Sequence, residues 1–304
     1  MHKKAAGLAL IFCAAPSWMG AQAPAATAAT AMPANPLHRQ YTEGETLAYK
    51  MTGTNENWHY TVRAEGTVKK NERGGWVEEY RWTDMTSDGQ PYTMAPVMAD
   101  FRQRLSLDPK VMPSVPDLTK VDPKLIGPIT DLMTFYVDLW LPEMMGVVKK
   151  PGDHYYFKMG QPSSWADGTH VLVGVSSIDF DFTLKSVDAV AGTATLEVKH
   201  VPPVKPQIPL PGAWMQTPVG DAANNWVEVM KQSDGKFEAG VGQETFTVDL
   251  TVSLADGKIL SGTMDNVVKT IHRTCDDQAL TQCGVPVPHQ IERKIEIALE
   301  PVKP

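Results

Sequence analysis

Two aspartates in a strand-like segment are the residues whose spacing comes closest to a catalytic arrangement. Asp179 and Asp181 stand two positions apart, so a β-strand would carry both carboxylates on one face, about 7 Å from each other. Paired carboxylates at such a distance can act as acid and base in glycoside hydrolysis. The solvated face of a half-buried strand shows the same alternation, and we prefer this second interpretation.

The histidines and the other acidic residues match no catalytic, metal-binding or cofactor motif. The histidines after position 2 have no HxH, HxxH or HExxH spacing, and Gly174–Ser177 lacks the last glycine of a GxSxG nucleophile elbow. Asp276 and Asp277 could contribute to a calcium site, but such a site needs about six or more oxygen ligands, which favours an ordinary polar loop. His200 falls on the apolar side of its strand and is expected to be a core residue. We therefore expect no metal and no cofactor, and we favour a protein that is not an enzyme.

Two cysteines near the C-terminus can form a covalent link. In an exported chain the oxidising compartment favours a disulfide between Cys275 and Cys283, which would stabilise the fold by roughly 2–3 kcal/mol. The alternative is that both thiols stay free, because a zinc site needs more ligands and only His272 and His289 lie near in sequence. We predict the disulfide.

Methionine and aromatic side chains gather in one segment and could line an adaptable apolar pocket. Of these, Met133, Tyr136 and Trp140 are our candidates for binding an apolar ligand. The alternative is simple packing, because any helix that covers a sheet needs such an apolar stripe.

Strands and one helix must position these residues. Apolar and polar residues alternate with period 2 in several segments, which indicates half-buried strands. The clearest are Ser177–Lys185, Thr193–Lys199, Thr245–Leu254 and Lys294–Glu300.

Tight turns join several of these strands. The pairs Asp234-Gly235 and Asp256-Gly257 are strong hairpin signals, and strands joined so closely must be antiparallel. We count roughly ten to twelve strands. The expected fold is therefore mostly β, a large antiparallel curved sheet or a β-sandwich.

One segment has a helical period instead. From about 122 to 141, apolar residues recur every three or four positions, which predicts one main amphipathic helix packed on the sheet. Asp122 and Pro123 suit its start, and Pro142 is expected to follow its end. Acidic residues within the segment argue against a membrane span.

The N-terminus has the layout of a secretory signal peptide. Lys3 and Lys4 precede an apolar run, Ala5–Ala15, that is too short to span a bilayer of roughly 30 Å. We assign residues 1–28 to the signal peptide and 29–40 to a flexible leader. Cleavage after position 23 is an alternative, and Cys13 is expected to leave with the signal. The protein should therefore be exported, periplasmic or extracellular, in a bacterium.

The remaining chain, 41–304, is expected to form a single mostly-β domain. The proline-rich stretch 201–218 could instead divide it into two subdomains. The formal net charge of −7 and the absence of a basic block argue against nucleic-acid binding.

Three functions follow in order of preference. The first is a non-catalytic binding module of the cell envelope that holds an apolar small molecule or a lipid. Curved sheets covered by a helix occur among periplasmic carriers of lipids and lipoproteins, although no motif here matches such a family. The second is a structural or protein-interaction module with an envelope partner, bound through a sheet edge or the proline-rich stretch. The third is a hydrolase with dispersed catalytic residues.

Overall fold

The computed structural model describes residues 35–158, 179–202, 210 and 212–301, together with the backbone of 163–165 and 170–176. All of them belong to the unit from Met32 to Pro304. The predicted signal peptide, 1–28, lies outside the described residues.

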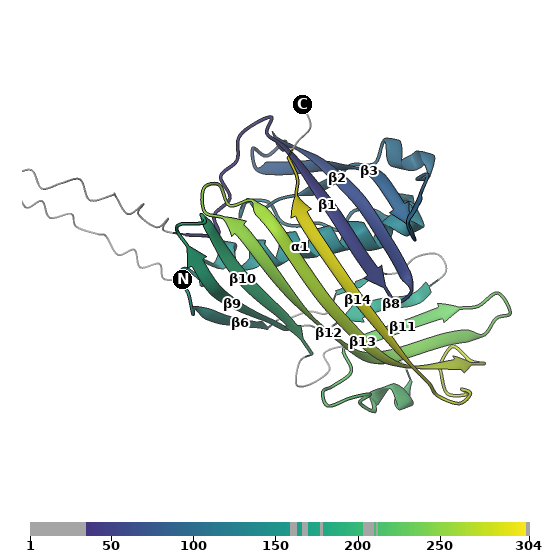
Figure 1. Ribbon diagram of the computed structural model, residues 1–304. Coiled ribbons are helices and arrows are strands. Elements are labelled where there is room, and N and C mark those ends of the chain that lie inside the picture. Colours follow the sequence, from purple (N-terminus) through teal and green to yellow (C-terminus); the bar gives the residue numbers. More distant parts are fainter. Residues whose placement is uncertain are drawn as a thin grey trace, which may run out of the picture. The chain divides into compact units, whose positions relative to one another are not determined.

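The described chain is one large antiparallel sheet with one long helix packed on a face of it (Figure 1). This confirms the predicted fold class. The sheet has fourteen strands, of which β4, β5 and β7 have only two or three residues. The strands are β1 (Thr46–Asn55), β2 (Trp58–Lys70), β3 (Trp76–Ser87), β4 (Gln90–Pro91), β5 (Gln103–Leu105), β6 (His154–Lys158), β7 (Ser163–Trp165), β8 (His170–Ser176), β9 (Asp179–Asp188), β10 (Thr193–Val201), β11 (Trp226–Lys231), β12 (Phe237–Ser253), β13 (Ile259–Cys275) and β14 (Val287–Leu299).

The sheet divides into two branches at β12. Its main path runs β4-β3-β2-β1-β14-β13-β12-β10-β9-β6. The C-terminal part of β12 pairs with β10, whereas Phe237–Gly242 pairs with β11, which continues to β8 and β7. We call the second branch, together with the C-terminal end of β13 and the N-terminal end of β14, the tail of the sheet.

Several strands are longer than the sequence pattern predicted. The segment Thr245–Leu254 is only the second half of β12, which has 17 residues and begins at Phe237. Likewise β14 begins at Val287, seven residues before the predicted start at Lys294. The alternation is weaker in these added parts, because Gly240 and Gly242 interrupt the polar face of β12 and the first four residues of β14 are all exposed. Period 2 is therefore clearest where a strand covers the main core.

The helix forms where it was predicted but ends later. A 3-10 turn, η3 (Pro123–Leu125), leads into α1 (Ile126–Met145), and the Asp122 carboxylate accepts a hydrogen bond from the backbone N–H of Lys124. The predicted end before Pro142 was wrong. Proline removes one N–H, but the last turn is closed by Gly146, at φ 61°, whose N–H bonds to the carbonyls of Pro142 and Glu143.

The main core lies between α1 and the sheet. It draws buried side chains from β3, near one end of the main path, and from β9, near the other end, so the sheet curves around the helix. Close approach depends on Gly262 of β13, because a Cβ there would stand 2.9 Å from Cε1 of Phe135. A second, smaller core in the tail contains Val229, Val241 and Cys275.

The strands before and after the proline-rich stretch 201–218 belong to the same sheet, although 203–209 and 211 lie outside the described residues. Among the described residues, no helix is long and apolar enough to cross a membrane.

Candidate functional site

A buried polar cluster occupies the interface between the helix and the sheet. Its centre is Glu78 of β3, which is 1% exposed. The Glu78 carboxylate accepts hydrogen bonds from Nε of Arg39 at 3.0 Å, from the hydroxyl of Tyr80 at 2.7 Å and from the hydroxyl of Tyr136. Burial, together with the negative charge of Glu78, raises the pKa of both tyrosine hydroxyls well above the usual value, so they stay donors at physiological pH. A charge at this depth is tolerated because it is paired and hydrogen-bonded.

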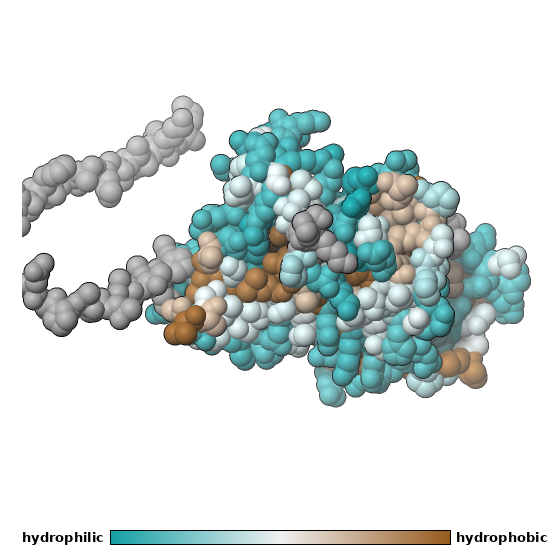
Figure 2. Space-filling view, turned by 45° about the horizontal axis from the view of Figure 1, so that its top comes forward, coloured by the Kyte–Doolittle hydropathy of each residue, from teal (hydrophilic) through white to brown (hydrophobic). Residues whose placement is uncertain are grey.

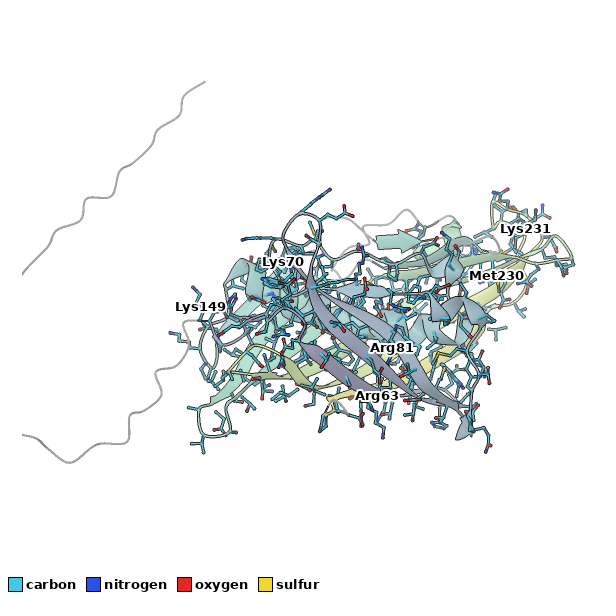
Figure 3. The ribbon with its side chains drawn as sticks, turned by 90° about the horizontal axis from the view of Figure 1, so that it is seen from above. Arg63, Lys70, Arg81, Lys149, Met230 and Lys231 are labelled. Carbon is cyan, nitrogen blue, oxygen red and sulfur yellow. A yellow bond between two sulfur atoms is a disulfide. The ribbon has the colours of Figure 1, made fainter. Side chains whose placement is uncertain are left out.

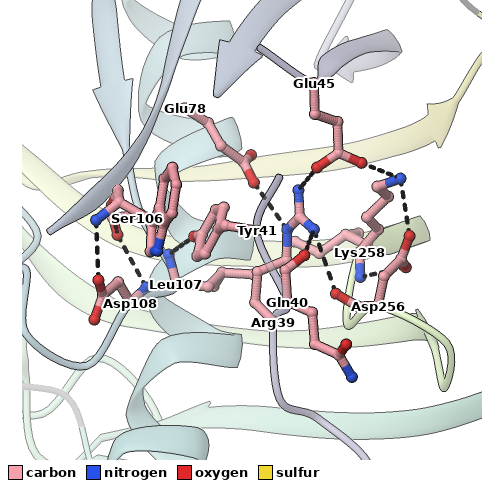
Figure 4. A network of polar contacts seen from close by, with 12 residues as sticks. Arg39, Gln40, Tyr41, Glu45, Glu78, Ser106, Leu107, Asp108, Asp256 and Lys258 are labelled. Carbon is pink, nitrogen blue, oxygen red and sulfur yellow. Dashed lines mark hydrogen bonds and ion pairs between the residues drawn. The ribbon is translucent and has the colours of Figure 1, made fainter. Parts of the chain in front are cut away.

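The N-terminal segment 35–45 is a strap fastened to this cluster (Figure 4). Leu37 is fully buried, and the Arg39 guanidinium also donates to Glu45 at 2.7 Å. The backbone N–H of Gln40 bonds to the carbonyl of Asp256 at 2.8 Å. Residues 35–40 were expected to belong to a flexible leader, but in the structure they are packed, because Leu37 and Arg39 each find a buried partner.

The three predicted ligand-binding residues lie in different environments along α1. Tyr136 is 2% exposed and its hydroxyl lies 2.6 Å from that of Tyr80. Trp140 is 6% exposed, and its Nε1 donates to the carbonyl of Asp108 at 3.2 Å. Met133 is partly buried against the main core. The structure therefore brings them to the helix–sheet interface, while binding of an apolar ligand by them stays a prediction.

Two acidic residues of α1 also pair with the sheet. Asp131 contacts Arg293 of β14 and accepts from the hydroxyl of Tyr60 at 3.2 Å. Asp138 contacts Nε2 of His200 at 2.8 Å, and both side chains are almost fully buried. Burial raises the pKa of Asp138, and His200 partly offsets this effect. His200 is thus the partnered core residue that its strand position indicated.

The third helix acid, Glu143, lies in the last turn and meets the strap. Its side chain is 1% exposed, and Oε1 lies 2.8 Å from Nδ1 of His38. Oε2 is buried without a hydrogen-bond partner among the described residues. Burial raises the pKa of Glu143 to about 7, and the negative end of the helix acts in the same direction.

The paired aspartates of β9 differ from the expectation of a solvated face. Asp179 is 3% exposed and accepts from the hydroxyl of Tyr156 at 2.6 Å, whereas Asp181 pairs with His154. Both partners come from β6, the neighbouring strand, whose side chains project on the same face. Each carboxylate is therefore paired with its own neighbour on β6.

Cys275 and Cys283 form the predicted disulfide, with Cα atoms 4.0 Å apart. The loop that it closes is ordered by Asp277, whose carboxylate accepts from the backbone N–H groups of Gln282 at 2.7 Å and Thr281 at 2.9 Å. These hydrogen bonds lower the pKa of Asp277, and the one from Gln282 has the largest effect. Asp277 thus shapes the loop, as expected for a polar loop beside a disulfide.

The tail carries an open hollow of about 530 Å3, called the distal hollow. Val285 and Val287 are 80% and 56% exposed. The rings of His272 and His289, from neighbouring strands, lie 5.8 Å apart. The hollow is lined by Glu238, His272, Arg273, Thr274, Gly284, Val285, Val287, Pro288 and His289. Burial lowers the pKa of His272, so its ring is neutral at physiological pH.

Beside the distal hollow, one edge of β14 is open. Strand β1 pairs only with Arg293–Leu299, whereas β13 pairs with β14 from Val287 onward. The carbonyl of Glu292 accepts from the N–H of Glu56 at 3.0 Å, so it points away from β13. Since backbone groups alternate along a strand, the N–H and C=O of Gln290 and the C=O of Pro288 point the same way. No described strand pairs with this edge at Val287–Ile291.

Three of the other open hollows on the described chain have strongly charged linings, and a fourth, beside the strap, also contains Tyr41, Trp76 and Pro109. None of the five hollows that we describe, of about 480 to 550 Å3, is lined by Met133, Tyr136 or Trp140. Most of the face drawn in Figure 2 is hydrophilic, and its hydrophobic residues form a short band and a few small spots. Among the described residues, no group of three or more His, Cys, Asp or Glu side chains could hold a metal ion.

Neither the buried ion pairs nor the open edge was predicted from the sequence. The acids of α1 were taken only as evidence against a membrane span. The seven-residue spacing of Asp131 and Asp138 places them on one stripe of the helix, which could have indicated buried partners. The open edge left no signal, because it depends on where β1 stops pairing.

A scan against protein-family models finds no match to this chain. A search of curated proteins likewise finds no match.

Proposed function

We propose that this protein is an exported binding module of the cell envelope without catalytic activity, and that its ligand is an extended apolar segment of a partner polypeptide. Export rests on the signal-peptide layout of residues 1–28. The observation that carries the proposal is the open edge of β14 directly beside the distal hollow.

The edge and the hollow together favour a polypeptide. An added strand can pair with the backbone groups of Gln290 and the carbonyl of Pro288. Every second side chain of such a strand would face the hollow, where Val285 and Val287 offer apolar contact. A lipid could use the hollow but not the backbone groups. Pro288 has no N–H to offer, which keeps the paired stretch short and suits a reversible complex.

The helix–sheet interface gives weaker support to an enclosed ligand. The hydroxyl of Tyr136 and the indole N–H of Trp140 are already bonded within the chain. A ligand there would have to displace buried, satisfied polar groups, which is costly. We therefore place an apolar ligand or lipid beneath α1 second.

The test is selection of binders from a random peptide library displayed on phage, with the purified protein as bait. We expect peptides with alternating apolar residues. Gln290→Pro should weaken their binding at least tenfold, because it removes an N–H on the open side while leaving the β13 ladder intact. Gln290→Ala is the matched control and should bind normally. Val287→Asp should also weaken binding, because it places a charge in the hollow.

Melting temperatures of the variants serve as the folding control. If no peptide is selected, or if selected peptides bind Gln290→Pro and Val287→Asp as well as the original protein, the proposal is wrong.

A further inference from the structure

A second surface, far from the distal hollow in the chain, combines exposed apolar side chains with cations. The loop Asp108–Asp117 follows β5 and contains three prolines, which restrict its backbone. Met112 and Val115 in this loop are 77% and 61% exposed. Single exposed apolar residues are common, but two at one loop tip need an explanation.

The base of the loop is held firmly. The Asp108 carboxylate accepts from the backbone N–H groups of Trp76 and Lys110, both at 2.9 Å. Val111 sits over Gly75 in the β2–β3 turn, where a Cβ on the glycine would stand 2.5 Å from Cγ2 of the valine. The chain therefore presents Met112 outward from a fixed support.

Cations flank the side of the loop that faces the β2–β3 turn. A hollow of about 500 Å3 beside it is lined by five cations and a single acid, namely Lys69, Lys70, Arg73, Arg104, Lys110 and Glu72, together with Val111 and Met112. Lys69 and Arg104 both pair with Glu79, the latter at 3.0 Å. Lys70, Arg73 and Lys110 have no acidic partner among the described residues. This concentration of positive charge contrasts with the net charge of −7 for the whole chain.

The strands beside this hollow carry further cations, but those cations are paired with acids. Lys70 stands at the end of β2, and Arg63 and Arg81 lie further along β2 and β3 (Figure 3). Arg63 and Arg81 share a second hollow with Lys69, Arg102 and the acids Glu65 and Glu79. Both arginines pair with Glu65, and Arg63 also pairs with Glu300, so the unpaired positive charge of the described residues is concentrated at Lys70, Arg73 and Lys110 around the loop.

We infer that the loop Asp108–Asp117 and its cationic surroundings dock on an anionic phospholipid surface. Met112 and Val115 enter the headgroup region, and Lys70, Arg73 and Lys110 pair with lipid phosphates. Charge complementarity selects an anionic surface, and the projecting apolar side chains select a bilayer over a soluble anion or an acidic protein, which would leave them in water. This inference does not depend on the function proposed for the distal hollow.

The test is flotation of the purified protein with vesicles of phosphatidylglycerol and phosphatidylcholine, against vesicles of phosphatidylcholine alone. Binding should require the anionic lipid and weaken at 0.5 M NaCl, because salt screens surface charges. Replacing Lys70, Arg73 and Lys110 together by glutamine should lower the partition coefficient about 100-fold, because each removed charge should lower it roughly fivefold. The pair Met112→Ser and Val115→Ser should lower it roughly tenfold.

The matched control replaces three exposed tail cations, Lys231, Lys236 and Lys269, by glutamine. Lys231 lies at the opposite end of the described unit from Lys70 (Figure 3). This variant has the same net charge as the first and should float as the original protein does. Equal loss in both triple variants would overturn the inference, as would absence of flotation with anionic vesicles.

A competition experiment with soluble anions distinguishes a membrane from an anion in solution. If polyglutamate or inorganic phosphate competes fully with the vesicles, and the serine pair floats unchanged, the surface binds an anion in solution and the membrane inference is wrong.

Discussion

The clearest quantitative prediction concerns Glu143, the buried carboxyl that joins the helix to the strap. Burial raises its pKa from the ordinary 4.5 to about 7. The folded chain therefore holds this proton more tightly than the unfolded chain. The stabilisation from the protonated form is complete below pH 4.5 and is lost as the pH rises through about 7.

The magnitude follows from the two pKa values. The interval from 4.5 to about 7, at about 1.4 kcal/mol per pH unit, corresponds to about 3.5 kcal/mol of unfolding free energy. Most of this change falls between pH 5 and pH 8, because the unfolded carboxyl is already largely ionised at pH 5. Such a change is a large fraction of the stability of an ordinary domain.

The perturbation is Glu143→Gln, which keeps an oxygen near His38 but cannot ionise. Urea unfolding followed by far-UV circular dichroism should show that the original protein loses roughly 2–3 kcal/mol relative to the variant between pH 5 and pH 8. The control is Glu296→Gln, an exposed carboxyl of β14, which should stay parallel to the original protein over this range. Comparing variants at each pH cancels the contributions of groups that do not contact Glu143, such as Asp138 and His272.

If the curves of the original protein and Glu143→Gln run parallel from pH 5 to pH 8, the burial argument for Glu143 is refuted. A steeper fall in the variant would refute the sign.

Further predictions address the buried cluster and the disulfide. Arg39→Met should lower the unfolding free energy by about 3–5 kcal/mol in urea titrations, because it leaves Glu78 buried without its cation. The control Arg81→Met, which removes an exposed cation, should cost less than about 1 kcal/mol. Equal costs would contradict the importance of the buried pair. Tyr136→Phe should cost about 1–3 kcal/mol, since one donor to Glu78 is lost, and an unchanged melting temperature would count against that bond. Cys283→Ala should cost roughly 2–3 kcal/mol of unfolding free energy in calorimetry, the same loss that a reductant causes in the original protein. If a reductant also destabilised the variant, the loss could not be assigned to the disulfide.

Local patterns gave most of the secondary structure. The period-2 segments are strands, and the helix lies within a few residues of its predicted range because apolar spacing depends only on neighbours along the chain. The extra turn of α1 beyond Pro142 was missed, since a proline near a helix end does not by itself decide where the last carbonyls find donors. The disulfide followed from the two cysteines and the expected compartment alone.

Contacts between distant segments could not be read in the same way. Arg39 and Glu78 are 39 positions apart, and Asp138 and His200 are 62 apart. Each of these residues is an ordinary polar residue in its own segment. Only packing shows that it is buried and which charge compensates it.

The sequence by itself determined that this chain makes an antiparallel sheet with one amphipathic helix, because hydrophobic periodicity and turn residues act over a few positions. It also determined which two cysteines form the disulfide, since Cys275 and Cys283 are the only cysteines after the predicted signal peptide. The tertiary structure alone decided where the sheet branches at β12, which edge of β14 stays open, and which loop carries Met112 beside Lys70 and Arg73. These features follow from strand register and curvature, which are set by the packing of the whole sheet on α1 rather than by any local segment.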